Sequence, residues 1–344
     1  MKRLVIAMTA LALAACGDDD TEENTDTVTA AETETAFAAA EASPGSWIWV
    51  PVGGAKCRDG SDTGFLVRLQ PNATEWFMYL EGGGACFNSL TCLQNPSSFG
   101  PTDVSSTVDT LSFGLFDDAN VDNPVAGWNA AYVPYCSGDV FAGSREGVAV
   151  PGVSGTQDFV GARNVSAITD LLATRYSDAS RVLLTGSSAG GFGAAFNYDR
   201  VATRFAPTRV DLLNDSGQPF AFGDALSSCL AAQWFDLWGI EFPSGCTTCG
   251  ADQEGIFGYA QYITDTYPNA DFALSSYTED EVIRFFFAFG KDACEPMDFT
   301  PISGVAFSSG LFDIRTGLDR WATFYATGSD HTFLRFESYQ SLVV

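Results

Sequence analysis

The sequence predicts an α/β fold in which a mostly parallel central sheet carries helices on both faces. Short apolar runs, typical of buried strands, alternate with longer segments whose apolar residues recur at helical spacing. Strands separated by helices pair in parallel, because the chain must cross over the sheet to return. The chain has 344 residues, and residues 44–344 fit one large domain with a sizeable core.

The elements alternate along the chain in the order that such a sheet requires. Apolar runs predict strands at residues 47–52, 65–69, 76–80, 130–134, 181–185, 210–213, 271–274 and 321–326. Helical spacing predicts helices at residues 157–176, 189–205 and 279–289. Residues 215–270 are less regular and contain three cysteines, so we expect a disulfide-containing excursion over the sheet.

Residues 1–16 are similar to a bacterial lipoprotein signal peptide. Lys2 and Arg3 precede an apolar run, and small residues then lead to Cys16. The pattern predicts cleavage before Cys16 and lipid attachment to it; an ordinary signal peptide is the alternative. The apolar run is too short for a transmembrane helix. We therefore expect an exported protein, either secreted or held at the cell envelope by lipid alone.

The segment that follows, residues 17–43, is strongly acidic. It holds nine carboxylates and no Lys or Arg, and most of its other residues are Thr and Ala. Such a segment repels itself and has little apolar surface to bury, so it predicts a disordered tether. A short Ala/Glu helix near residues 36–42 is the alternative.

The formal net charge of −26 excludes a nucleic-acid partner. Subtracting the nine acidic residues of the tether from 43, and Lys2 and Arg3 from 17, leaves 34 against 15, or −19 for the domain. Phosphate contacts need clustered Lys and Arg, which a domain of this charge does not offer. We expect a monomer whose partner is its substrate.

Eight cysteines remain when Cys16 is set aside: Cys57, Cys86, Cys92, Cys136, Cys229, Cys246, Cys249 and Cys294. An even number in an exported chain predicts disulfides. The spacing of Cys246 and Cys249 also suits a zinc or redox pair, but zinc needs further ligands and the chain has one histidine. We therefore expect no metal and no cofactor.

The strongest motif is Gly186-Ser-Ser188-Ala-Gly190, which stands between a predicted buried strand and a predicted helix. In this context the motif predicts a tight turn that exposes Ser188 as a nucleophile, with Ser187 as the neighbouring alternative. A serine hydroxyl needs a base to become nucleophilic. His331, the only histidine, follows the last predicted strand and is the candidate base.

A third residue should orient the histidine and follow a strand between Ser188 and His331. Asp280 fits best, and Glu279, Asp298, Asp313 and Asp330 are the alternatives. Acyl transfer also needs amide donors for an oxyanion. The amide after the nucleophile belongs to Ala189, and the glycine run at residues 82–84, which follows a predicted strand, offers Gly83 and Gly84.

Together these segments resemble the pectinacetylesterase/Notum family of carboxylesterases. The matching segments are residues 80–88, 127–140, 181–191, 197–201 and 214–217, so the resemblance covers residues 45–217 and is thin beyond them. It implies an α/β-hydrolase fold, a triad of Ser188, His331 and Asp280, oxyanion donors at Gly83, Gly84 and Ala189, and no metal. Gly84 replaces a tryptophan of many relatives, which implies a wider pocket entrance.

The resemblance also implies disulfides Cys57–Cys136 and Cys86–Cys92. It leaves the pairing of Cys229, Cys246, Cys249 and Cys294 open. Asp139 and Asp215 are expected near the pocket, where they either contact substrate or fix loops.

The function expected from the sequence is serine ester hydrolysis through an acyl-enzyme. The resemblance implies an O-acetylated, pectin-like polysaccharide as substrate, although an acidic domain would repel polygalacturonate at low salt. The alternatives are an esterase acting on fatty-acyl, small-molecule or polyester substrates, and a non-catalytic surface binding protein with the same fold.

Overall fold

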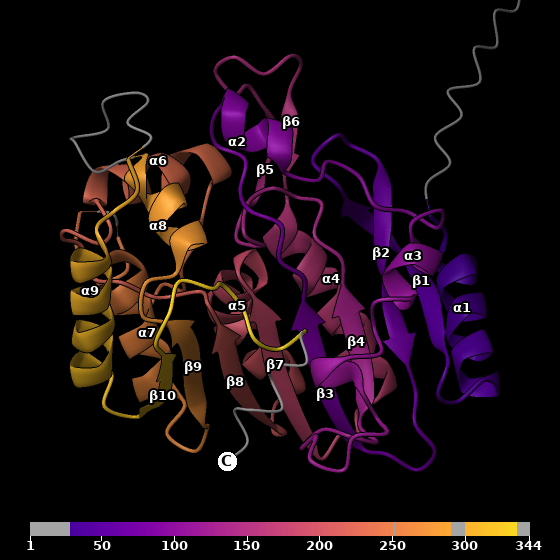
Figure 1. The fold of residues 1–344 in the computed structure, drawn as a ribbon. Helices are drawn as coiled ribbons and strands as arrows, with labels where there is room; N and C mark the ends of the chain where they lie inside the picture. Colours follow the sequence, from indigo (N-terminus) through magenta and orange to yellow (C-terminus); the bar gives the residue numbers. More distant parts are fainter. Residues whose placement is uncertain (1–27, 251, 290–299, 336–344) are drawn as a thin grey trace, which may run out of the picture.

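The computed structural model describes residues 28–250, 252–289 and 300–335. The predicted signal peptide, Cys16, residues 17–27 of the predicted tether, Cys294 and Asp298 lie outside this part of the chain. Figure 1 presents a central sheet whose strands run side by side across the molecule, with helices packed against it.

Eight strands form the central sheet, in the spatial order β1-β2-β4-β3-β7-β8-β9-β10. Only β2 runs antiparallel to its neighbours, so the sheet is parallel from β4 to β10 and β1 points the same way. The strands are β1 (Trp47–Lys56), β2 (Asp62–Arg68), β3 (Glu75–Leu80), β4 (Asn129–Val133), β7 (Arg181–Ser187), β8 (Arg209–Asp215), β9 (Phe272–Tyr277) and β10 (Trp321–Ala326). A separate antiparallel pair is formed by β5 (Arg145–Val148) and β6 (Gln157–Phe159).

The helices of the described residues connect these strands. They are α1 (Ala30–Ala42), α2 (Ser89–Gln94), α3 (Val104–Val108), the 3₁₀ helix η1 (Gly114–Phe116), α4 (Gly161–Arg175), α5 (Ala189–Phe205), α6 (Ser228–Trp238), α7 (Gly255–Thr266), α8 (Glu281–Ala288) and α9 (Gly304–Gly317). None of the helices in this part of the chain is long and apolar enough to cross a bilayer.

Side chains that alternate along each central strand enter two separate cores. In β3, Trp76 and Met78 enter the larger core, whereas Phe77 and Tyr79 enter a smaller one. Because successive side chains of a strand point to opposite faces, the two cores lie on the two faces of the sheet. Helices α4 and α5 cover the larger core, and the segment around η1 covers the smaller one.

The predicted fold class is confirmed, and each predicted strand is present, the last with the predicted bounds and the others with shifted ends. The predicted helix over 157–176 starts too early, because residues 157–159 form β6 and pair with β5. The predicted excursion over 215–270 contains α6 and α7.

Disulfides Cys57–Cys136 and Cys86–Cys92 are present, as the family resemblance implied. Cys246 pairs with Cys249. Cys229 is also in a disulfide.

The prediction of a disordered tether up to residue 43 is wrong for its last part, because residues 30–42 form helix α1 on the edge strand β1. Thr29 and Glu32 make a capping box at its start. Phe37 is 1% exposed and meets the rings of Phe65 and Tyr176. The acidic residues of the helix are exposed, so the charge that suggested disorder lies on its solvent side.

Two of these carboxylates, on Glu34 and Glu41, lie 2.7 Å and 3.0 Å from the guanidinium of Arg175 in α4. The net repulsion expected from composition is therefore partly offset by a cation from elsewhere in the chain. The folded domain accordingly begins before residue 44.

We predict that Phe37→Ala lowers the free energy of unfolding by about 3 kcal/mol, because it removes a buried ring and leaves a cavity against the sheet. Thr35→Ala, on the exposed face of the same helix, should stay within about 0.5 kcal/mol of the parent. Urea unfolding followed by circular dichroism measures both. Equal stability of the two variants would mean that α1 does not pack on β1 in solution.

Candidate active site

Ser188 stands at the turn where the chain leaves β7 and enters α5. Its backbone has φ 58° and ψ −122°, a region that residues other than glycine rarely occupy. A side chain at Gly190 would overlap the backbone of Leu80, and a side chain at Gly186 would overlap the backbone of Gly190. The two glycines permit a turn this tight, and the tight turn forces the unusual backbone at Ser188.

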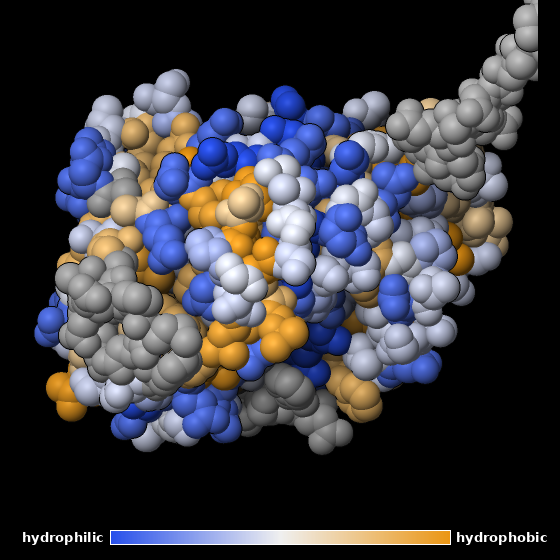
Figure 2. Space-filling model, turned by 90° about the horizontal axis from the view of Figure 1, so that it is seen from above, coloured by the Kyte–Doolittle hydropathy of each residue, from blue (hydrophilic) through white to orange (hydrophobic). Residues whose placement is uncertain are grey.

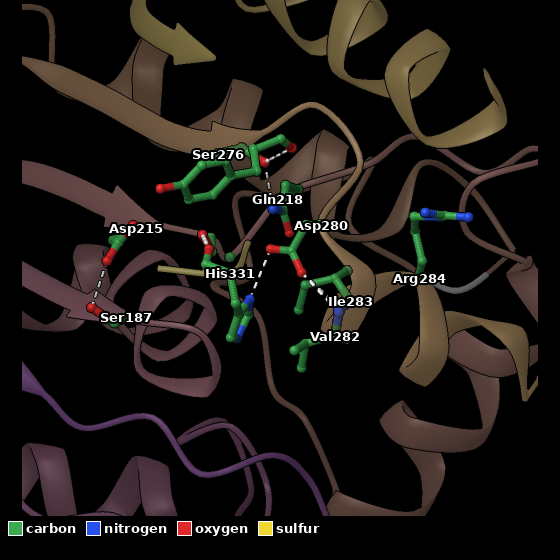
Figure 3. A network of polar contacts seen from close by, with 12 residues as sticks. Ser187, Asp215, Gln218, Ser276, Asp280, Val282, Ile283, Arg284 and His331 are labelled. Carbon is green, nitrogen blue, oxygen red and sulfur yellow. Dashed lines mark hydrogen bonds and ion pairs between the residues drawn. The ribbon is translucent and has the colours of Figure 1, made fainter. Parts of the chain in front are cut away.

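His331, in the loop after β10, faces Asp280, which follows β9 (Figure 3). The two atoms His331 Nδ1 and Asp280 Oδ2 are 2.8 Å apart, and the Asp280 side chain is fully buried. Because a carboxylate only accepts, Nδ1 carries the proton and Nε2 keeps a lone pair. Nε2 is buried and has no hydrogen-bond partner among the described residues, so it is available as a base.

The second oxygen of Asp280 holds the start of α8. Asp280 Oδ1 accepts hydrogen bonds from the amides of Val282 and Ile283, at 3.1 Å and 3.0 Å. One carboxylate therefore both orients the histidine and caps the helix that follows it.

The other candidates for the acid are placed differently. Glu279 lies 3.9 Å from the guanidinium of Arg284, and its side chain is 58% exposed. Asp313, on α9, and Asp330 are exposed. Of the acidic residues considered from the sequence and described here, only Asp280 contacts the imidazole.

The nucleophile turn and the histidine loop are both bonded to the end of β8. The amide of Ser188 donates to the carbonyl of Asp215 at 2.7 Å. The hydroxyl of the next residue, Ser216, donates to the carbonyl of His331. Two adjacent residues thus bring Ser188 and His331 to the same edge of the sheet.

The glycine run after β3 packs directly against the nucleophile turn. A Cβ at Gly82 would lie 2.7 Å from the carbonyl oxygen of Ser187 and 3.1 Å from the Cβ of Ser188. The amides of Gly83 and Gly84 donate to no acceptor within the described residues. They and the amide of Ala189, the first residue of α5, are the candidate oxyanion donors.

An apolar pocket opens beside Ser188. Its remaining lining comes from the loops after β3 and β4 and from helices α5 to α8: Gly84, Ala85, Val140, Ala189, Phe192, Phe196, Trp234, Trp238, Ile240, Ile256, Ile283, Phe286 and Phe287. Seen from the side on which α6 and α8 lie, hydrophobic residues gather in the middle of the face and hydrophilic residues surround them (Figure 2).

The replacement of a tryptophan by Gly84 predicted a wider pocket entrance. The space beside Gly84 is nevertheless filled. Its φ is +79°, and a Cβ there would be 3.0 Å from the ring of Phe286. The phenylalanine of α8 thus occupies the space over the glycine.

Of the two roles considered for Asp139 and Asp215, the structure does not support contact with substrate, because both are fully buried and neither lines the pocket beside Ser188. Asp139 accepts hydrogen bonds from the hydroxyl of Ser137 and the amides of Phe141, Gly143 and Gly161. Burial raises the pKa of Asp139 and of Asp215, and the donors around each carboxylate oppose that rise. The contacts of Asp139 and Asp215 support the alternative role, in which each carboxylate fixes loops.

Sequence reasoning missed the roles of several neighbours. Ser187, considered only as a rival nucleophile, is buried, and its hydroxyl donates to Asp215 at 2.6 Å (Figure 3). The pocket wall formed by Ile283, Phe286 and Phe287 was also missed. The sequence feature that indicated this wall is an apolar helix that begins directly after the candidate acid.

No group of three or more His, Cys, Asp or Glu residues in the described ranges is arranged to hold a metal ion. The groups brought together are instead a serine, a histidine, a carboxylate and free backbone amides beside an apolar pocket. This arrangement suits acyl transfer.

Comparison with known proteins shows to which family this chain belongs. The model of the family described as pectinacetylesterase matches residues 46–241, which is more than half of the chain. The chain belongs to the pectinacetylesterase family. The matched residues include the glycine run after β3 and the Ser188 turn, while Asp280 and His331 lie beyond them.

Curated relatives of this pectinacetylesterase family member include two palmitoleoyl-protein carboxylesterases. Notum2 of Xenopus laevis is 34% identical over 177 residues, which cover 47% of this chain and 33% of the relative. Human NOTUM is 32% identical over 173 residues, covering 47% of this chain and 34% of the relative. The chain thus matches about a third of the length of these relatives.

The crystal structure of the Wnt deacylase Notum from Drosophila has a similar fold. It superposes with a TM-score of 0.56 at 23% identity, covering 82% of this chain and 84% of that one. A second crystal form gives 0.57 at 22% identity. At this level of identity the likeness establishes the α/β-hydrolase-like fold.

We predict that Asp280→Asn lowers kcat for p-nitrophenyl acetate by about 10³- to 10⁴-fold, while the free energy of unfolding changes little. The amide oxygen can still cap α8, but the amide nitrogen faces Nδ1 and selects the tautomer whose Nε2 carries the proton. Asp280→Ala should lose activity similarly and also about 1 kcal/mol of stability, because the cap is removed. Activity assays and urea unfolding test both variants. Full activity of Asp280→Asn would show that the Asp280 carboxylate is not needed for catalysis.

Proposed function

We propose that this protein is a serine carboxylic ester hydrolase in which Ser188 is the nucleophile, His331 the base and Asp280 the residue that orients the base. The observation that carries the proposal is the pair formed by His331 and the fully buried Asp280, 2.8 Å apart, at the sheet edge where Ser188 stands on its strained turn.

In the proposed reaction, Nε2 of His331 takes the proton of the Ser188 hydroxyl as its oxygen attacks the ester carbonyl. The negative charge of the tetrahedral intermediate is held by the amides of Gly83, Gly84 and Ala189. The C–O bond to the alcohol breaks, and the imidazolium returns the proton to the leaving alcohol. Water then repeats the sequence on the acyl-enzyme and releases the acid.

The lining of the pocket favours an acyl group longer than acetyl. Trp234, Trp238 and Phe287 are nearly fully buried, and their apolar faces surround the space beside Ser188. The single methyl of an acetyl group would contact only the part next to the serine. A longer chain would remove more apolar surface from water, at about 0.8 kcal/mol per methylene. The names of the curated relatives, palmitoleoyl-protein carboxylesterases, agree with this preference.

The second candidate is release of acetate from an O-acetylated polysaccharide, and the description of the matching family favours it. The net charge argues against a polyanionic pectin, because the domain and the polymer would repel each other at low salt.

We also propose that the protein is exported and carries lipid on Cys16. Three disulfides between described cysteines support export, since such bonds persist in oxidising compartments.

Ser188→Ala should reduce hydrolysis of p-nitrophenyl butyrate to the background rate, because Ser188 carries the only hydroxyl among the described residues that line the pocket. Ser187→Ala is the matched control and should keep the fold and at least a tenth of the activity. Initial rates measured at equal concentrations of folded protein test both. A Ser188→Ala variant as active as the parent would reject enzymatic function at this site and leave a binding protein.

We predict that kcat/KM rises about 10-fold from p-nitrophenyl acetate to the butyrate, which adds two methylenes worth about 1.6 kcal/mol. Ile256→Trp should abolish this gain by filling the pocket from α7. Val121→Trp, on a side chain that is 94% exposed, is the control and should keep it. A parent enzyme that prefers acetate would support the polysaccharide candidate, which acetate release from acetylated xylan and pectin then tests.

A further inference from the structure

A second buried carboxylate lies next to the candidate triad and has no direct part in the proposed reaction. Asp215 is 0% exposed, and among the described residues no cationic side chain pairs with it. Its two oxygens accept hydrogen bonds from four groups: the hydroxyls of Ser187 and Ser275 and the amides of Phe333 and Leu334, at 2.6 Å to 3.2 Å.

These four donors belong to the three segments that carry the triad. Ser187 immediately precedes the nucleophile, Phe333 and Leu334 follow the histidine by two and three residues, and Ser275 lies in β9, which leads to Asp280. The carbonyl of Asp215 also accepts the amide of Ser188. One residue at the end of β8 thus joins the nucleophile, the base and the acid segments.

We propose that Asp215 is a positioning residue of the active site, whose carboxylate holds the His331 loop in register with the Ser188 turn. The proposal rests on the serine hydrolase function proposed above. Asp215 acts through other residues, because it neither lines the pocket nor bonds to the imidazole.

A carboxylate suits this position because it only accepts, and every neighbour donates. Two of the donors are backbone amides that cannot turn away. Without an acceptor they would stay buried and unsatisfied, and the loop would shift to find other partners. A displacement of about 1 Å at a reacting group can lower a rate by about 10²-fold.

The loop has other anchors, so loss of Asp215 should not unfold it. The ring of Phe333 stacks on that of Tyr277 with centroids 4.3 Å apart, and the carbonyl of Leu334 accepts the amide of Leu115 at 2.9 Å. Variants at Asp215 should therefore keep the fold, while the His331 loop shifts relative to the Ser188 turn.

The experiment compares Asp215→Ala, Asp215→Asn and Asp211→Asn with the parent. Asp211 is the matched control, because it is a buried carboxylate on the same strand. It lies towards the opposite end of β8, where it pairs with Arg181 and Arg209. The kinetic readout is kcat and KM for p-nitrophenyl butyrate, with thermal unfolding measured on each protein.

We expect kcat to fall about 100-fold in Asp215→Ala and about 10-fold in Asp215→Asn, whose amide oxygen can still accept from one side. KM should stay within about twofold of the parent value. Asp211→Asn should melt at a lower temperature but keep kcat within about twofold. A kcat in Asp215→Ala equal to that of Asp211→Asn would reduce Asp215 to a structural role, and a raised KM at unchanged kcat would make it a substrate contact.

A spectroscopic measurement separates this proposal from the function it rests on. The chain has one histidine, so the downfield proton signal of an imidazole bonded to a carboxylate reports on His331 and Asp280 alone. The signal should be present in the parent and in Asp211→Asn and be lost to exchange in Asp215→Ala. An inactive parent would reject the proposed function, whereas an unchanged signal in Asp215→Ala would reject the positioning role.

Discussion

The site depends on one close backbone contact, between the turn that follows β7 and the end of β3. Leu80 lies so near Gly190 that no side chain fits between them. This contact sets the unusual φ of Ser188 and brings the glycine run after β3 against the same turn. The proposed nucleophile and the amides proposed to stabilise its oxyanion are therefore placed by a single packing constraint rather than by separate ones.

A second coupling links the chemistry to the pocket. Asp280 holds the imidazole with one oxygen and the start of α8 with the other. Helix α8 carries Ile283, Phe286 and Phe287 into the pocket wall. A change in the position of that wall would act on the carboxylate that contacts His331, so the proposed acyl pocket and the proposed base are structurally coupled. Such a connection is consistent with enzymes that use binding energy from remote parts of a substrate.

The strands of the sheet and the nucleophile turn could be predicted because they depend on local patterns: apolar runs, and glycines at fixed distances from Ser188. His331 was predicted as the base because the chain has one histidine, and Asp280 was predicted as the best fit among several acidic residues because the acid must follow a strand. Helix α1 was predicted only as a short alternative near residues 36–42, because Arg175, which offsets its charge, is more than a hundred residues away. Asp215 and the pocket wall required tertiary contacts, which composition and spacing do not encode.

Helix α1 also determines from which side the chain reaches the domain. The carbonyl of Val28 lies close to Gly53, near the end of β1, and β1 points to the same edge of the sheet as β7. The chain therefore joins the described domain near the edge of the sheet at which Ser188 stands.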